Sequence, residues 1–138
     1  MIRVTRRYSF PAAHVLAQPR FDDERNRRIF GKCANPNGHG HDYEVEVSIE
    51  GPVDPETGRI IDIEALDRFF EDAVLRRFSH RLLNELDCFA ERVPTSENIA
   101  RVIRDELAAV VDRAGSAHVA NVRLTETARN HVDFGDAT

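Results

Sequence analysis

The sequence lacks several features that would assign it to other classes of protein. It has no tryptophan, only two cysteines in 138 residues, and no apolar run long enough to span a membrane. Residues 1–7 alternate between apolar and polar side chains and do not form the apolar stretch of a signal peptide, so we expect a cytoplasmic protein without a membrane partner. Cys33 and Cys88 are therefore expected to be free thiols rather than a disulfide.

An excess of positive charge is also absent, because 19 lysines and arginines are outnumbered by 24 acidic residues. The net charge is −5 at pH 7, which argues against a nucleic-acid partner because such proteins carry a basic excess. Five basic residues nevertheless cluster ahead of the motif described below: Arg20, Arg25, Arg27, Arg28 and Lys32. They form either a local binding patch or a solvated loop, and the sequence leaves both interpretations open.

The order of apolar patterns predicts the fold. A length of 138 residues with 41% apolar side chains is typical of one domain, residues 1–138. Four strands are expected: residues 2–10, ending near Pro11; residues 43–51, or from as early as His39; residues 119–127; and residues 131–134. Two helices are expected, from Asp62 through Val74 and from Thr95 or Ser96 to about Gly115. Residues 15–38 are expected to be an irregular loop. This ββααββ order predicts an α+β domain in which a four-stranded antiparallel sheet is covered on one face by two helices.

The most informative segment is residues 31–43, with the sequence GKCANPNGHGHDY. The strand that follows alternates strictly, and Tyr43 begins its apolar face. Because side chains in a strand have a period of two, His39 and His41 continue this face if the extended backbone begins at His39. Two imidazoles placed in this way are close enough to bind one metal ion.

Two other strands carry an ionisable residue at one end of their apolar row. The even-numbered row of the first strand leads to His14, and the row of the strand at residues 119–127 leads to Glu126. A carboxylate in such a row is unfavourable unless it is paired or bound to a ligand. The three strand ends together predict a built site, in which His14, His39 and His41 supply the three ligands that are usual for a catalytic zinc.

Residue types alone leave alternatives open at this site. His80, His118 and His131 compete with His14 for the third ligand position. Cys33 is a fourth ligand that closes a structural site, an inert thiol, or a catalytic thiolate whose pKa is lowered by a neighbouring cation and imidazole. The residues by themselves indicate a metal-dependent enzyme with a cysteine base or nucleophile.

Several motifs together resemble the 6-pyruvoyl tetrahydropterin synthase family, which includes the 6-carboxytetrahydropterin synthases of queuosine biosynthesis. The motifs, in this order, are FPAAH at residues 10–14, the block at residues 31–43, PTSEN at residues 94–98 and TET at residues 125–127. The resemblance covers essentially the whole chain. It implies the tunnelling fold (T-fold), in which strands of neighbouring subunits meet to form a homo-oligomer, a trimer or a hexamer.

The resemblance also implies a role for each matching position. These roles are zinc ligation by His14, His39 and His41, proton abstraction by Cys33, a catalytic relay at His80, anchoring of the pterin by Glu126, and lining of the pterin pocket by Thr95, Ser96 and Glu97. The implied substrate is 7,8-dihydroneopterin triphosphate, which a zinc-dependent lyase converts to 6-pyruvoyl tetrahydropterin with loss of triphosphate. Five residues separate Cys33 from His39, a spacing that favours this product over the 6-carboxy pterin.

One position departs from the family pattern. The family typically has an aspartate before the relay histidine, whereas this chain has Ser79 before His80. Serine brings no negative charge, so we expect a weaker relay or a substitute acid such as Asp87 or Asp133. A non-catalytic, zinc-stabilised oligomer that binds pterins or purines, and a zinc hydrolase, are the competing hypotheses.

Overall fold

A computed structural model, which describes residues 1–113 and 115–135, contains one antiparallel sheet with the strand order β1-β2-β3-β4. The strands are β1 (Ile2–His14), β2 (His39–Gly51), β3 (His118–Thr127) and β4 (Asn130–Gly135). Consecutive strands are neighbours throughout, so β1 and β4 are the edges of the sheet. No helix in the described ranges is long and apolar enough to cross a membrane.

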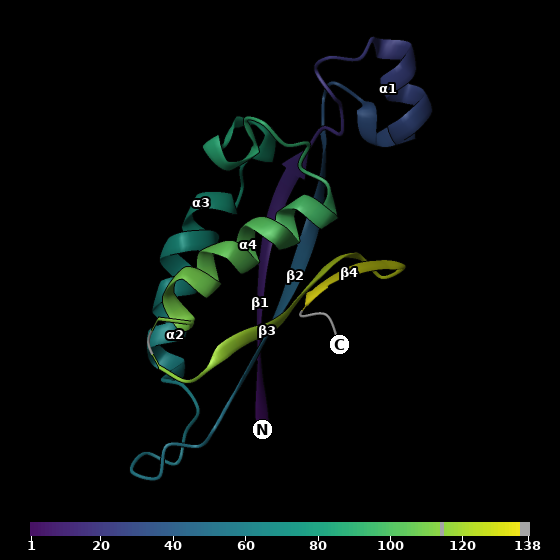
Figure 1. The fold of residues 1–138 in the computed structure, drawn as a ribbon. Coiled ribbons are helices and arrows are strands. Elements are labelled where there is room, and N and C mark those ends of the chain that lie inside the picture. The colour runs from purple at the N-terminus through teal and green to yellow at the C-terminus, as the bar shows by residue number, and fades with distance from the viewer. Residues whose placement is uncertain (114, 136–138) are drawn as a thin grey trace.

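The helices lie mainly on one face of this sheet (Figure 1). The α-helices are α1 (Asp23–Phe30), α2 (Ile63–Phe70), α3 (Arg76–Phe78) and α4 (Ser96–Val111), and a π-helical turn (Glu71–Leu75) joins α2 to α3. The described residues also include three short 3-10 helices: η1 (Gly31–Ala34), η3 (Leu83–Glu85) and η4 (Asp87–Phe89). The predicted α+β fold is therefore confirmed, and the first predicted helix is the continuous run from α2 to α3.

The core fills the space between the sheet and the helices α2 and α4. Its largest fully buried side chains include Phe10 and Tyr43 from the strands and Phe70, Phe78 and Ile103 from the helices. The alternation of apolar residues predicted for the strands explains this core, because every second side chain of a strand points toward the helices. Burial of these side chains fixes the register of β1 against β2, on which the geometry of the site depends.

β1 continues past Pro11 to His14, so the prediction that it ends near Pro11 is wrong. Proline is tolerated here because β1 is an edge strand, where the missing N–H faces no further strand of the sheet. The Pro11 carbonyl is used instead, and it accepts a hydrogen bond from the His80 N–H at 2.7 Å.

The segment predicted to be an irregular loop contains α1 and η1, which is a second correction. The Asp22 side chain caps α1 by accepting a hydrogen bond from the Arg25 N–H at 2.7 Å. Asn26 is the only buried residue of α1, so this helix has no apolar stripe that periodicity could reveal. Figure 1 shows α1 beyond the ends of β1 and β2, away from the other helices.

α4 begins as predicted, with Thr95 as its N-cap, but it ends at Val111 rather than near Gly115. The Asp112 carboxylate accepts a hydrogen bond from the Val119 N–H at 3.2 Å, which ties the end of the helix to the start of β3. The N-terminus of α4 lies at the other end of the sheet, where the predicted site residues gather.

Candidate metal centre

The pairing of β1 with β2 brings three histidines together. His14 pairs with His39 and Ala12 pairs with His41, in the same uninterrupted register that pairs Phe10 with Tyr43. Side chains at these positions share the helix-facing side of the sheet, as the alternation in the sequence predicted. His14 is fully buried, whereas His39 and His41 are partly accessible.

The three rings are close enough to share one ion. One nitrogen from each of His14, His39 and His41 lies within 4.8 Å of the others. The Nε2 atoms of His14 and His39 are 2.9 Å apart, and the ring planes are steeply inclined, by 62° to 88°. Two nitrogens bound to a tetrahedral zinc at about 2.0–2.1 Å are separated by about 3.3 Å, so small movements would complete the coordination.

Unsatisfied nitrogens support a metal at this position. Among the described residues, His39 Nδ1 and His41 Nε2 are buried ring nitrogens that have no hydrogen-bond partner. Buried polar atoms without partners are unfavourable, and a cation bound beside the Nε2 atoms of His14 and His39 would satisfy the Nε2 of His41. Three imidazoles without a thiolate are the donor set of a catalytic zinc, so the residues fit that metal.

The tautomer of His14 is fixed by its surroundings. Its Nδ1–H donates to the Pro94 carbonyl at 2.9 Å, because a carbonyl oxygen can only accept. The Tyr43 hydroxyl lies 3.2 Å from the same nitrogen. The Nε2 of the neutral ring therefore carries a lone pair directed at the cluster.

Burial keeps two of these rings neutral. It lowers the pKa of His14, with the Pro94 hydrogen bond opposing the shift, and it lowers the pKa of His39, with the charge of His41 adding to the effect. A histidine must be neutral to bind a metal, so both rings are prepared for ligation near pH 7.

Glu126 lies beside the histidine cluster, as the sequence predicted. Its Oε1 is 3.8 Å from His41 Nε2, and its Oε2 accepts a hydrogen bond from the Ser96 hydroxyl at 2.7 Å. The β3–β4 register shifts between Thr125 and Thr127, so Glu126 occupies a bulge. Bulges reorient side chains at sheet ends, and this one turns the carboxylate toward the N-terminus of α4.

The start of α4 places the other predicted substrate residues. The Thr95 hydroxyl accepts a hydrogen bond from the Asn98 N–H at 3.2 Å, which caps the helix. Ser96 is buried against Glu126, while Glu97 is exposed in the first turn. The structure therefore brings Ser96 into contact with the site and leaves Glu97 at its rim.

Cys33 lies outside the cluster of potential ligands. It is half-buried in η1, and its carbonyl accepts a hydrogen bond from the Leu16 N–H at 2.7 Å. Among the described residues, the group able to hold a metal contains His14, His39 and His41 without a thiol. Burial, and then the charge of Glu126, raise the pKa of Cys33, so the protein's own groups do not provide the lowered value expected from the sequence.

The other candidate residues are more distant from the cluster. His80 is exposed after α3 and has a positive φ of 59°; it lines a hollow of about 480 Å³ that His41 also lines. His118 approaches Glu50 at 3.8 Å and His131 approaches Asp133 at 3.9 Å, so neither joins the cluster.

Of the two suggested substitutes for the missing aspartate, Asp133 is engaged elsewhere. It accepts two hydrogen bonds from the Arg123 guanidinium, at 2.8 and 2.9 Å. Asp87 is exposed at the start of η4.

Three groups at the site carried no sequence signal. The Pro94 carbonyl is a backbone atom, the Tyr43 hydroxyl belongs to a residue that the alternation assigns to the core, and Asn84 lies outside every motif. Asn84 could be found only from the tertiary structure, because it contacts Val15 from 69 positions away.

Comparisons with known proteins agree with this geometry. The family model described as 6-pyruvoyl tetrahydropterin synthase matches residues 3–136. A Pongo abelii protein named 6-pyruvoyl tetrahydrobiopterin synthase is 40% identical over 133 residues, which cover 96% of this chain and 90% of the relative. An Archaeoglobus fulgidus protein named putative 6-carboxy-5,6,7,8-tetrahydropterin synthase is 44% identical over 100 residues, with coverages of 72% and 70%.

A solved structure extends the likeness to three dimensions. The Caenorhabditis elegans 6-pyruvoyl tetrahydropterin synthase superposes with a TM-score of 0.90 at 33% identity, and the match covers 99% of this chain and 96% of that one. The fold, the sequence and the family model agree over nearly the whole length. The chain therefore belongs to the 6-pyruvoyl tetrahydropterin synthase family.

Proposed function

We propose that this protein is a zinc-dependent lyase that acts on 7,8-dihydroneopterin triphosphate and releases triphosphate to give 6-pyruvoyl tetrahydropterin. The observation that carries the proposal is the cluster of His14, His39 and His41, which has unsatisfied ring nitrogens and no thiol among its ligands. Three protein ligands leave a zinc coordination position open for substrate. The names of the relatives support the reaction class.

The metal would act as a Lewis acid, polarising oxygens of the substrate side chain and so acidifying the neighbouring carbon-bound proton. Cys33 would remove that proton as a thiolate. Because burial and the Glu126 carboxylate raise the pKa of Cys33, the thiol needs a nearby cation to become a base near neutral pH. This dependence supports a role in which the thiol is active only in the metal-loaded protein.

Glu126 would anchor the pterin by accepting hydrogen bonds from its guanidine-like edge. The Ser96 hydroxyl holds one carboxylate oxygen at 2.7 Å, which orients the side chain for this contact. Thr95 and Glu97 would line the pterin pocket from the first turn of α4. His80 would serve the proton relay, with Ser79 in place of the charged partner that the family typically has.

The assembly and setting of the enzyme are also proposed. In the described sheet β4 and the part of β1 before Pro11 are edges that could pair with further copies, which supports a homo-oligomeric domain of residues 1–138, a trimer or a hexamer. We expect it in the cytoplasm, without a nucleic-acid or membrane partner, acting on a small-molecule pterin triphosphate.

A second product is supported by one relative. The Archaeoglobus fulgidus protein, named as a putative 6-carboxy-5,6,7,8-tetrahydropterin synthase, is 44% identical over 100 residues. Incubation of the zinc-loaded protein with 7,8-dihydroneopterin triphosphate, followed by mass spectrometry, separates the two products. The 6-pyruvoyl pterin is the expected product; the 6-carboxy pterin would replace the first assignment with the second, and an unchanged substrate would remove both.

Two non-lyase functions have distinct outcomes in the same assay. A non-catalytic pterin- or purine-binding oligomer, which Ser79 favours, would bind the substrate stoichiometrically and release no product. A zinc hydrolase would use metal-activated water, so it would keep its activity in Cys33→Ala, whereas the proposed lyase would lose it.

A further inference from the structure

We propose that Asn84 is a positioning residue that holds the metal ligand His14 by clamping the main chain of Val15. This inference rests on the proposed metal centre. The Asn84 Oδ1 accepts a hydrogen bond from the Val15 N–H at 2.8 Å, and its Nδ2 donates to the Val15 carbonyl at 2.8 Å. Both backbone groups of the residue directly after His14 are thus bound by one side chain.

The clamp completes a row of bonds along the outer edge of β1. The His80 N–H donates to the Pro11 carbonyl at 2.7 Å, and the Ala13 N–H donates to the Arg81 carbonyl at 2.9 Å. Ala13 and Leu82 form a parallel bridge. The last residues of β1 therefore meet a short parallel partner at alternate positions, the spacing that a strand requires.

Beyond Leu82 the side chain of Asn84, rather than backbone, pairs with the main chain of Val15. Leu83 begins η3, so the backbone of this segment is no longer extended where Val15 needs it. The Asn84 amide combines N–H donors with a carbonyl acceptor, as a peptide unit does, and replaces the missing backbone partner. His14 is consequently bracketed by bonds to Ala13 on one side and to Val15 on the other.

The position of the His14 ring depends on these hydrogen bonds to Ala13 and Val15. Its Nδ1 donates to the Pro94 carbonyl at 2.9 Å, and its Nε2 lies 2.9 Å from His39 Nε2. A ligand held at both ends tolerates little backbone displacement, because a metal site requires ligand distances within about 0.2 Å of their ideal values. Movement of Val15 would shift the His14 Cα and with it both contacts of the ring.

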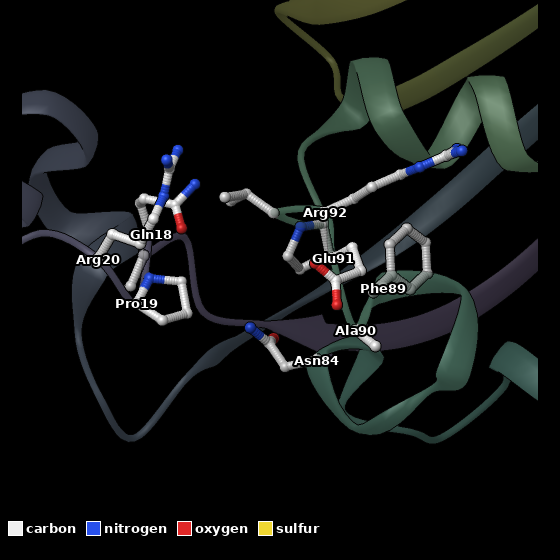
Figure 2. A pocket seen from close by; sticks show the side chains of 11 residues that line it. Gln18, Pro19, Arg20, Asn84, Phe89, Ala90, Glu91 and Arg92 are labelled. Carbon is white, nitrogen blue, oxygen red and sulfur yellow. The ribbon is translucent and has the colours of Figure 1, made fainter.

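Asn84 lines a cavity beside the metal centre. The cavity has a volume of about 590 Å³, and it is lined by Asn84 and Pro94 together with the segments 17–20 and 89–93. Figure 2 shows Asn84 between Pro19 on one wall and Ala90 on the other. Because Asn84 borders open space rather than the packed core, removal of its amide should loosen the clamp without preventing folding.

Asn26 provides a matched control. It makes the same pair of bonds to another residue of the same loop, accepting from the Gln18 N–H at 2.9 Å and donating to the Gln18 carbonyl at 3.2 Å. Gln18 is not adjacent to a metal ligand. Loss of this second clamp should disturb the loop and leave the metal centre intact.

The test measures zinc affinity by competition with a chromophoric chelator, together with the visible spectrum of the Co²⁺-substituted protein. Asn84→Ala should bind zinc about tenfold more weakly or worse, as expected when a contact that orients a ligand is lost. Its Co²⁺ bands should weaken or shift, while Asn26→Ala should stay within about twofold of the parent. Asn84→Ser, whose hydroxyl is too short to make both bonds, should behave like Asn84→Ala and serves if that variant folds poorly. Thermal unfolding of the metal-free proteins reports folding.

Parent affinity in either Asn84 variant, or an equal loss in Asn26→Ala, would overturn the assignment. If the parent itself binds no zinc, the metal centre fails and the clamp has no ligand to position. The two failures are therefore distinguishable.

Discussion

The hydrogen bond from Ser96 to Glu126 gives the sharpest test of substrate anchoring. Ser96→Ala removes a 2.7 Å bond to a carboxylate whose side chain is 15% exposed. A hydrogen bond to a charged group contributes about 1.5–3 kcal/mol, and partial access of water to the carboxylate offsets some of that loss. We therefore expect a net cost of about 1.4 kcal/mol, or about tenfold in the KM for 7,8-dihydroneopterin triphosphate.

The effect should fall on binding rather than on chemistry. Glu126 is proposed to hold the pterin ring, and Ser96 fixes the orientation of its carboxylate, so kcat should stay within about twofold of the parent. Zinc content should be unchanged, because Ser96 contacts none of the three histidines. Steady-state measurement of triphosphate release, with metal analysis of each preparation, gives all three quantities.

Ser48→Ala is the matched control. Ser48 is 7% exposed, Ser96 is 5% exposed, and the Ser48 hydroxyl makes one side-chain hydrogen bond, to Thr5 at 2.9 Å. This variant should lose a hydrogen bond between two neutral hydroxyls, at a similarly buried serine, without a change in KM. An unchanged KM in Ser96→Ala, or an equal rise in Ser48→Ala, would show that Glu126 is not oriented for substrate by this contact.

Three further predictions concern ionisable groups. In the metal-free protein Cys33 should alkylate with an apparent pKa above its ordinary 9.0, because burial and then the Glu126 charge raise it, and Glu126→Gln should lower that pKa; peptide mass spectrometry across pH checks this, and an ordinary value would contradict it. Ser79→Asp should raise turnover and shift its pH profile by adding a charge beside the relay histidine; no change in either would count against a weakened relay. The Arg123 guanidinium lowers the pKa of Asp133 to about 2 from 3.8, so this pair should stabilise the fold fully above about pH 4 and lose that contribution as the pH falls through 2. Thermal unfolding of Asp133→Asn between pH 2 and 5 should lack that component, and an unaltered pH dependence would be inconsistent with the pairing.

The strand parities made the metal cluster predictable from the sequence. His14 continues the apolar row of β1 and His39 that of β2, and antiparallel pairing then sets them opposite each other. This inference works because a strand has a fixed period of two and a buried face fixes its register. The position of Glu126 also follows from its row, although the bulge that turns its carboxylate does not.

Other elements were beyond prediction for identifiable reasons. α1 has a side-chain cap and one buried residue, Asn26, so apolar periodicity could not reveal it. The extension of β1 past Pro11 depends on its being an edge strand, which is a property of the whole sheet. The clamp from Asn84 and the carbonyl of Pro94 act through backbone contacts, which leave no pattern of residue types in the sequence.

The proposed centre is a zinc ion held by three imidazoles, with the sulfur of Cys33 nearby but unbound. Zinc K-edge X-ray absorption of the purified protein measures this directly, because Zn–N distances are about 2.0–2.1 Å and Zn–S distances about 2.3 Å. We predict one zinc per chain with a first shell of nitrogen and oxygen only, lost in His39→Ala and unchanged in Cys33→Ala. A sulfur shell at the longer distance, or full zinc occupancy in His39→Ala, would contradict the proposed centre.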